Sequence, residues 1–190
     1  MTGPPESLRT ERLLLRPWRD ADLAPFRAMN ADSEVMRFFA RPLPGDESDA
    51  VARRLMEFFD QGLGPWAVEV PGEAPFIGFV GAWPTREELP FAPAVEIGWR
   101  LARSYWGRGY APEAARAALD DAFARFNLDE IVAYAAAANA PSITLMRRIG
   151  MVQDAGGGFD HPRYPEDHPN RRSVLFRLSR DAFLRGRAVS

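Results

Sequence analysis

The segment Ala94–Glu113, AVEIGWRLARSYWGRGYAPE, most constrains the fold because it predicts a strand, a glycine-containing turn and a helix in direct succession. Two glycines in the turn, Gly107 and Gly109, let the backbone approach a ligand without an intervening Cβ atom. Pro112 is typical of a first helical turn, where unpaired N–H groups and the positive end of the helix dipole favour an anion. Arg108 adds a positive charge inside the turn. The sequence therefore predicts a phosphate-binding turn at this point.

Two familiar phosphate-binding motifs do not fit the turn. The chain contains no lysine, so all 24 basic residues are arginine, whereas a Walker-type P-loop requires a lysine after its glycines. A dinucleotide-binding fingerprint requires glycine at the position that Pro112 occupies. The chain also contains no cysteine, which excludes disulfides, thiolate metal ligands and a cysteine acyl-enzyme.

Length and composition indicate one folded domain over residues 1–190. Hydrophobic residues make up 46% of the chain, enough for a sizeable core at this length. The formal net charge of −2 gives no reason to expect nucleic acid or a membrane surface as a partner. No apolar run approaches the roughly 20 residues of a spanning helix, and the polar N-terminus does not resemble a signal peptide. We therefore expect a cytoplasmic protein.

The order of predicted elements is that of a mixed α/β domain. Hydrophobic periodicity, capping residues and turn residues define each element. Residues 1–8 are expected to fray. The predicted strands span residues 13–16, 66–70, 76–81, 95–101, 131–135 and 173–178, with a further strand beginning at 151–154. The predicted helices span about 20–30, 46–62, 112–126 and 139–150, with a final helical turn or two over 180–185.

Several motifs together resemble the GNAT superfamily of N-acetyltransferases, over about residues 8 to 180. The pyrophosphate loop of that family follows Gln/Arg-x-x-Gly-x-Gly/Ala, and Gly109 and Ala111 occupy its last two fixed positions. Trp106 stands at the first position, and the form Tyr-Trp-Gly-Arg-Gly-Tyr-Ala is similar to the Rim-type branch, which acetylates N-termini of ribosomal proteins. Further motifs resemble that branch: TERLLLRP at 10–17, EIGW at 96–99, Asn139-x-x-Ser142 and IGM at 149–151.

The resemblance implies a mostly antiparallel sheet of about seven strands, splayed at the cofactor site and flanked by helices. It implies acetyl-coenzyme A as the donor and no metal. The backbone around Trp99 and Leu101 would pair with the pantetheine amides, as an added strand does. Asn139 would orient the pantetheine arm, and its position also suits a helix N-cap. The implied cofactor-binding residues are Trp99, Leu101, Trp106, Gly107, Arg108, Gly109, Tyr110, Ala111, Asn139 and Ser142.

Acyl transfer to an amine requires a base for the amine proton and an acid for the departing thiolate. Many relatives supply the acid from a Tyr seven positions after the Asn, but Met146 stands there. The Rim-type resemblance implies Ser142 instead. Glu96 is a candidate base. The sequence leaves open which face of the strand Glu96 occupies, because this strand often contains a bulge. Asp160 and His161 in the late polar loop are alternative bases.

We therefore expect direct transfer of an acetyl group to a primary amine, either a protein N-terminus or a small molecule such as a polyamine or an antibiotic. The alternative is a non-catalytic acyl-coenzyme A sensor, which Met146 keeps open. Two segments could form the acceptor pocket, residues 38–45 and 156–172. A metal site at His161 and His168 is the less favoured interpretation of the late loop. A homodimer is a further expectation.

Overall fold

The computed structural model describes residues 7–60 and 62–187, and its strands form one continuous sheet. The order of strands across the sheet is β1-β2-β3-β4-β5-β6-β9-β7, with β8 also paired to β9. The strands are β1 (Leu8–Arg9), β2 (Leu14–Arg16), β3 (Pro65–Val70), β4 (Ala74–Pro84), β5 (Val95–Leu101), β6 (Glu130–Ala136), β7 (Val152–Gln153), β8 (Phe159–Asp160) and β9 (Arg172–Ser179). The helices are α1 (Leu23–Ala31), α2 (Ser33–Met36), α3 (Gly45–Asp60), α4 (Tyr110–Arg125), α5 (Ala140–Arg148) and α6 (Arg180–Arg187), with single turns η1 (Asp20–Asp22) and η2 (Arg103–Tyr105).

The sheet divides at the junction of β5 and β6. These strands run parallel and are in register at only one pair, Glu96 and Val132, whereas the other neighbouring strands are antiparallel. Beyond that pair, from Ile97 to Leu101, β5 has no partner strand on the β6 side. The predicted splayed, mostly antiparallel sheet is therefore confirmed.

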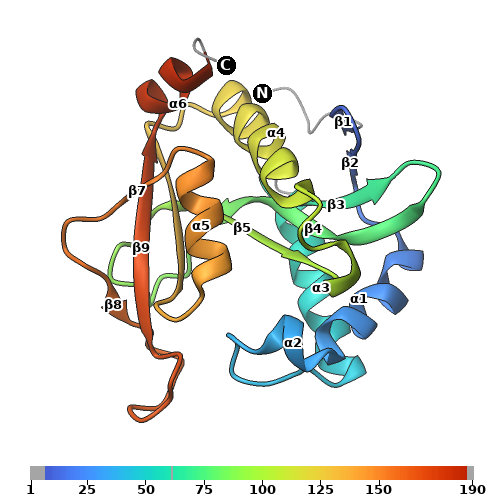
Figure 1. Ribbon diagram of the computed structural model, residues 1–190, viewed down its shortest axis with the longest axis horizontal. Coiled ribbons are helices and arrows are strands. Elements are labelled where there is room, and N and C mark those ends of the chain that lie inside the picture. The colour runs from blue at the N-terminus through green and yellow to red at the C-terminus, as the bar shows by residue number, and fades with distance from the viewer. Residues whose placement is uncertain (1–6, 61, 188–190) are drawn as a thin grey trace.

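Two hydrophobic clusters cover the two faces of the sheet, as the period-2 alternation of β3 and β4 dictates. Val68 and Ile77 face the cluster that contains α4 and α5, the two helices in front of the sheet in Figure 1. Their neighbours Ala67 and Phe76 face the opposite cluster, which contains residues of α1 and α3. The alanine-rich side of α4 is buried, which lets this helix lie close to the strands.

Short elements account for most differences from the sequence prediction. Within the described residues the sheet has nine strands instead of about seven, because β1 and β8, of two residues each, were not predicted. Leu8, expected to fray, pairs with Leu15, and residues 1–6 lie outside the described residues. Helix α4 begins at Tyr110, two residues before the predicted start at Pro112. No helix in the described part of the chain is long and apolar enough to cross a membrane.

Candidate active site

The turn before α4 presents a row of unpaired backbone amides. Gly107 and Gly109 have positive φ angles of 74° and 81°, a conformation that glycine adopts without strain. None of the amide N–H groups from Gly107 to Ala111 donates a hydrogen bond to an acceptor within the described residues. They precede or begin a 16-residue helix, whose dipole adds positive potential at the same place. The turn therefore has the unpaired amides and the helix N-terminus that the sequence predicts, and binding of an anion there stays a prediction.

The open edge of β5 faces the same region. The register between β4 and β5 is unbroken from the pair Gly78–Leu101 to the pair Pro84–Val95, so β5 has no bulge and the parity that the sequence left open is determined. The Ala102 N–H donates to the Ile77 carbonyl oxygen at 2.9 Å, so the backbone groups of the even-numbered residues point toward β4. The N–H and C=O groups of Trp99 and Leu101 therefore point to the unpaired side.

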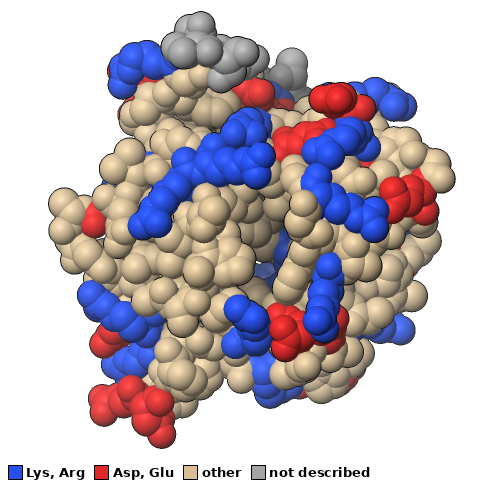
Figure 2. Space-filling view, viewed as in Figure 1, with Lys and Arg blue, Asp and Glu red and all other residues tan. Residues whose placement is uncertain are grey.

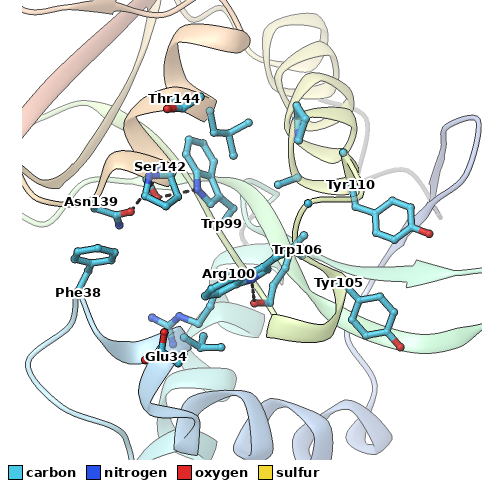
Figure 3. Close-up of a pocket in the computed structure, with 18 of the residues that line it drawn as sticks. Glu34, Phe38, Trp99, Arg100, Tyr105, Trp106, Tyr110, Asn139, Ser142 and Thr144 are labelled. Carbon is cyan, nitrogen blue, oxygen red and sulfur yellow. Dashed lines mark hydrogen bonds between the residues drawn. The ribbon is translucent and has the colours of Figure 1, made fainter.

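A cavity of about 490 Å³ lies where the open edge of β5, the turn and α5 meet. Figure 3 shows side chains from α2, β5, the turn and α5 converging on it, and in Figure 2 this face is hollowed near its centre. Nine of the ten residues predicted to bind the cofactor line the cavity: Trp99, Leu101, Trp106, Gly107, Gly109, Tyr110, Ala111, Asn139 and Ser142.

Arg108, the tenth predicted residue, does not line this cavity. Its guanidinium forms an ion pair of 2.7 Å with Glu73, and both side chains are about half exposed. The expectation that the Arg108 side chain supplies charge inside the turn is therefore not met, although its amide belongs to the unpaired row. A neighbouring depression carries further basic residues that border the turn: Arg9, Arg12, Arg116 and Arg148.

Asn139 and Ser142 meet at the start of α5. Asn139 is the N-cap of this helix, and its Oδ1 atom accepts a hydrogen bond of 3.2 Å from the Ser142 amide. The Ser142 hydroxyl oxygen accepts a hydrogen bond of 3.4 Å from the Trp99 indole nitrogen, drawn as a dashed line in Figure 3. Met146 is 1% exposed and packs in the core. Ser142 is therefore the hydroxyl that α5 places closest to the Trp99 side of the cavity.

Glu96 is buried behind the cavity and does not line it. The Trp83 indole donates a hydrogen bond of 2.5 Å to Oε1 of Glu96, whereas Oε2 is buried without a partner. Burial raises the pKa of Glu96 from its ordinary value of 4.5 to about 7. Because β5 does not bulge, Glu96, Gly98 and Arg100 share one face of the strand. The ring of Trp83 packs over Gly98, where an added Cβ atom would approach it to 2.6 Å.

The two alternative bases have different surroundings. Asp160 is exposed and forms ion pairs with Arg171 and Arg172 at 3.6 and 3.4 Å. His161 is buried beside Tyr164, at 5.1 Å between ring centroids, and burial lowers its pKa. Neither residue lines the cavity. Within the described residues no group of three or more His, Asp or Glu side chains could hold a metal ion.

The structure also brings together the two segments expected to form the acceptor pocket. The Tyr164 hydroxyl lies 3.4 Å from the Phe38 carbonyl oxygen, and the Asn170 side-chain amide donates to the Arg37 carbonyl oxygen at 3.1 Å. Phe39, at this end of the cavity, belongs to the predicted segment 38–45, whereas sequence reasoning missed Glu34 and Arg100. The one available signal was Arg100 itself, which with Glu96 is one of two charged residues in the predicted strand 95–101.

The chain is similar to known proteins in sequence and in fold. The Acetyltransferase (GNAT) domain family matches residues 12–152. The uncharacterized N-acetyltransferase YnaD of Bacillus subtilis is 32% identical over 151 residues, which cover 77% of this chain and 83% of that protein. The FsC-acetyl coenzyme A-N(2)-transacetylase of Aspergillus fumigatus is 29% identical over 190 residues, covering 94% and 78% of the two chains. The crystal structure of an acetyltransferase from Agrobacterium tumefaciens str. C58 has a TM-score of 0.74 at 29% identity and covers 95% of this chain and 98% of its own.

The chain therefore belongs to the GNAT acetyltransferase family, and it is an acetyl-coenzyme A-dependent N-acetyltransferase. Two independent observations indicate that the residues of the site fit acetyl-coenzyme A. The amides from Gly107 to Ala111 donate to no acceptor within the described residues and could bind the pyrophosphate. On the open edge of β5 the backbone groups of Trp99 could pair with an amide-containing arm, whereas the Leu101 carbonyl oxygen already accepts a hydrogen bond from the Trp106 indole.

Proposed function

We propose that the chain, acting as one domain over residues 1–190, transfers the acetyl group directly to a primary amine. The observation that carries this proposal is the convergence of the unpaired amides and the open β5 edge on one cavity, with Ser142 beside them. The strand edge would hold the pantetheine arm in an extended form. Asn139, whose Oδ1 is engaged in the helix cap, would offer its side-chain N–H groups to the same arm.

In the proposed reaction the amine nitrogen bonds to the thioester carbonyl carbon and the carbon–sulfur bond breaks. Glu96 accepts the amine proton through water, because Glu96 lies outside the lining of the cavity. Ser142 passes its hydroxyl proton to the departing thiolate and regains a proton from Glu96 through water, so both residues end the cycle unchanged. A carboxyl with a pKa of about 7 suits base work near neutral pH. No covalent enzyme adduct is required, in keeping with the absence of cysteine.

The acceptor is a protein N-terminus or a small amine. The Rim-type motifs around Trp106 support a peptide N-terminus. The loop after α2 and the late loop, which meet through Tyr164 and Asn170, would form the walls of the acceptor site. The net charge of −2 supports an acceptor other than nucleic acid. Assembly as a homodimer, which sedimentation velocity can measure, and a cytoplasmic location stay predictions.

Calorimetry with acetyl-coenzyme A tests the binding site. Gly109→Glu should abolish detectable binding, because its carboxylate would repel the pyrophosphate from the amide row. Gly157→Glu is a matched control: its φ of 76° is nearly that of Gly109, and a Cβ atom there meets nothing within 4 Å. Unchanged binding by Gly109→Glu would refute the assignment of the turn.

Thiol release separates catalysis from the alternative of a non-catalytic acyl-coenzyme A sensor. The protein is incubated with acetyl-coenzyme A and a mixture of peptides and small amines, and the products are identified by mass spectrometry. Amine-dependent thiol release with an acetylated product supports the proposed transfer. Tight binding without release above the rate of hydrolysis would favour the sensor.

A further inference from the structure

The guanidinium of Arg100 is held at one end of the cavity by neutral groups. Its Nη1 atom donates a hydrogen bond of 2.5 Å to Oδ1 of Asn30, whose Nδ2 atom donates in turn to the Ser48 hydroxyl at 2.8 Å. The ring of Phe39 lies 4.1 Å from the guanidinium carbon. Neither Nε nor Nη2 has a hydrogen-bond partner among the described residues, and Nε is fully buried. The guanidinium of Arg100 is therefore fixed in place, but part of its hydrogen-bonding capacity is unused.

The charge of Arg100 is not neutralised by the part of the chain that the structure describes. No Asp or Glu there lies within 4.0 Å of its guanidinium. The acid nearest in the lining, Glu34, pairs with Arg37 at 3.6 Å. Burial lowers the pKa of Arg100 to about 10, so the group stays cationic at neutral pH. Burying an unpaired charge costs several kcal/mol, so a ligand anion at this position would be strongly favoured.

A second arginine, Arg86, lies outside the lining of the cavity, close enough to Glu96 and His161 for its charge to affect both. Arg86 is partly buried, and its side chain has no hydrogen bond or ion pair to the described residues. Burial is the largest cause that lowers the pKa of His161, and the positive charges of Arg163 and Arg86 lower it further. Glu88 opposes these charges, and the carboxyl group of Glu96 also interacts with Arg86. Arg86 therefore adds positive charge near the proposed base, whereas Arg100 presents an unpaired positive charge to the cavity itself.

We propose that the acceptor amine carries a carboxylate that binds the guanidinium of Arg100 between β5 and the loop after α2. The inference rests on the proposed function and names its substrate class. Glu96 and Arg100 lie four residues apart on one face of β5, about 13 Å along the strand. The ring of Trp83 covers Gly98 between these two residues, so the acceptor would bind Arg100 from the cavity, and its amine proton would reach Glu96 only through water. The carboxylate belongs either to a small amino acid or to an acidic peptide N-terminus.

Matched acceptor pairs test the proposal. The pairs are β-alanine with β-alaninamide, γ-aminobutyrate with its amide, and C-terminally amidated Asp-Ala-Ala with Asn-Ala-Ala, with spermidine as a cation that lacks a carboxylate. In at least one pair the carboxylate member should have a kcat/KM about 10- to 100-fold higher, the effect of one charged hydrogen bond. The first two pairs report a small amino acid and the third an acidic peptide.

Substitutions assign that preference to one residue. Arg100→Met should reduce it to less than about twofold, and Arg100→Lys should retain part of it. Arg37→Met is the matched control, because Arg37 lines the same cavity but is exposed and paired with Glu34. It should keep the preference. Unchanged affinity for acetyl-coenzyme A shows that each variant is folded.

Three results would overturn the inference. They are equal kcat/KM within every pair, faster acetylation of spermidine than of every carboxylate, or a carboxylate preference that survives in Arg100→Met. The first two leave the proposed acetyl transfer intact. If no amine is acetylated, the proposed function fails, and calorimetry of N-acetyl-β-alanine with the coenzyme A-loaded protein decides the inference separately. Binding that Arg100→Met loses and Arg37→Met keeps supports it, and no binding by the wild type refutes it.

Discussion

The indole N–H of Trp106 donates a hydrogen bond of 2.8 Å to the carbonyl oxygen of Leu101, the last residue of β5. This bond ties the start of the amide row to the end of the open strand edge. Trp106 occupies the position where the family pattern has Gln or Arg, and here its ring also lines the cavity. The residue that departs from the pattern therefore joins the two parts of the predicted co-substrate site.

Trp106→Phe keeps an aromatic ring but removes the donor to Leu101. We expect acetyl-coenzyme A to bind about three- to tenfold more weakly, and the free energy of unfolding to fall by about 1 kcal/mol. Trp18→Phe is the control, because it removes a bond of 2.9 Å to the Pro65 carbonyl oxygen away from the cavity. That variant should lose similar stability without losing affinity in calorimetry. Equal affinity of wild type and Trp106→Phe would contradict the prediction.

The rise in rate on the acid side of the pH–rate profile should reflect ionisation of the Glu96 carboxyl group. Because burial raises its pKa to about 7, the basic form increases as pH rises through about 7, and kcat/KM should rise with it. Glu96→Gln should lower kcat by about 100-fold and remove this rise. Profiles measured with one acceptor from pH 5 to 9 check both points. An unchanged rise in Glu96→Gln would assign the base elsewhere, with His161 as the next candidate.

Glu96 should also make folding stability depend on pH. Between 4.5 and about 7 the unfolded carboxyl ionises while the folded one keeps its proton, so the free energy of unfolding falls as pH rises through this window. The difference in pKa corresponds to about 3 kcal/mol, fully lost above pH 7. Denaturant titrations at pH 5 and 8 should show this loss in the wild type and in exposed Glu87→Gln. Glu96→Gln should lack it.

Ser142→Ala should separate chemistry from binding. Loss of the hydroxyl removes the proposed thiolate acid, so kcat should fall about 10- to 100-fold. Affinity for acetyl-coenzyme A should change by less than about twofold, because the helix cap uses the backbone amide of Ser142. Thr144→Ala removes another hydroxyl from the cavity lining and should leave kcat unchanged. Wild-type turnover by Ser142→Ala would exclude Ser142 from the mechanism.

A buried ion pair far from the chemistry should dominate local stability. Arg16 donates hydrogen bonds of 2.8 Å to both oxygens of Asp22, and both side chains are 3% exposed. Arg16→Met should cost about 3–5 kcal/mol in denaturant titrations because it leaves the Asp22 charge buried and unpaired. Arg41→Met, which removes the exposed pair with Glu47, should cost less than about 1 kcal/mol. Similar losses in the two variants would contradict this ranking.

The sequence predicted those features whose cause is local. The succession of β5, turn and α4 could be read from the apolar strand, the glycines and Pro112, and the N-cap role of Asn139 from its place before Pro141. By contrast, the two-residue strands β1 and β8 have no periodicity to detect. They exist because their longer neighbours β2 and β9 offer free backbone groups.

The unpredicted parts of the site depend on contacts between distant segments. Arg100 is positioned by Asn30, 70 residues earlier, so its unpaired charge has no signature within β5. The raised pKa of Glu96 likewise follows from its burial, which the hydrogen bond from Trp83 only partly offsets, and the register of β4 and β5 brings these two residues together. Arg108 shows the opposite case, in which a charge correctly placed in the turn is drawn to Glu73 on a neighbouring connection.

The single register pair between Glu96 and Val132 makes the protein incomplete as a sheet. Two half-sheets meet there, and beyond that pair β5 has no neighbouring strand on the side of β6. In the proposed complex the pantetheine arm fills that position, so the small molecule becomes a structural member of the fold as well as a reactant. Each catalytic cycle would then include the removal and replacement of one element of the architecture, and coenzyme A should raise the melting temperature even when no acceptor is present.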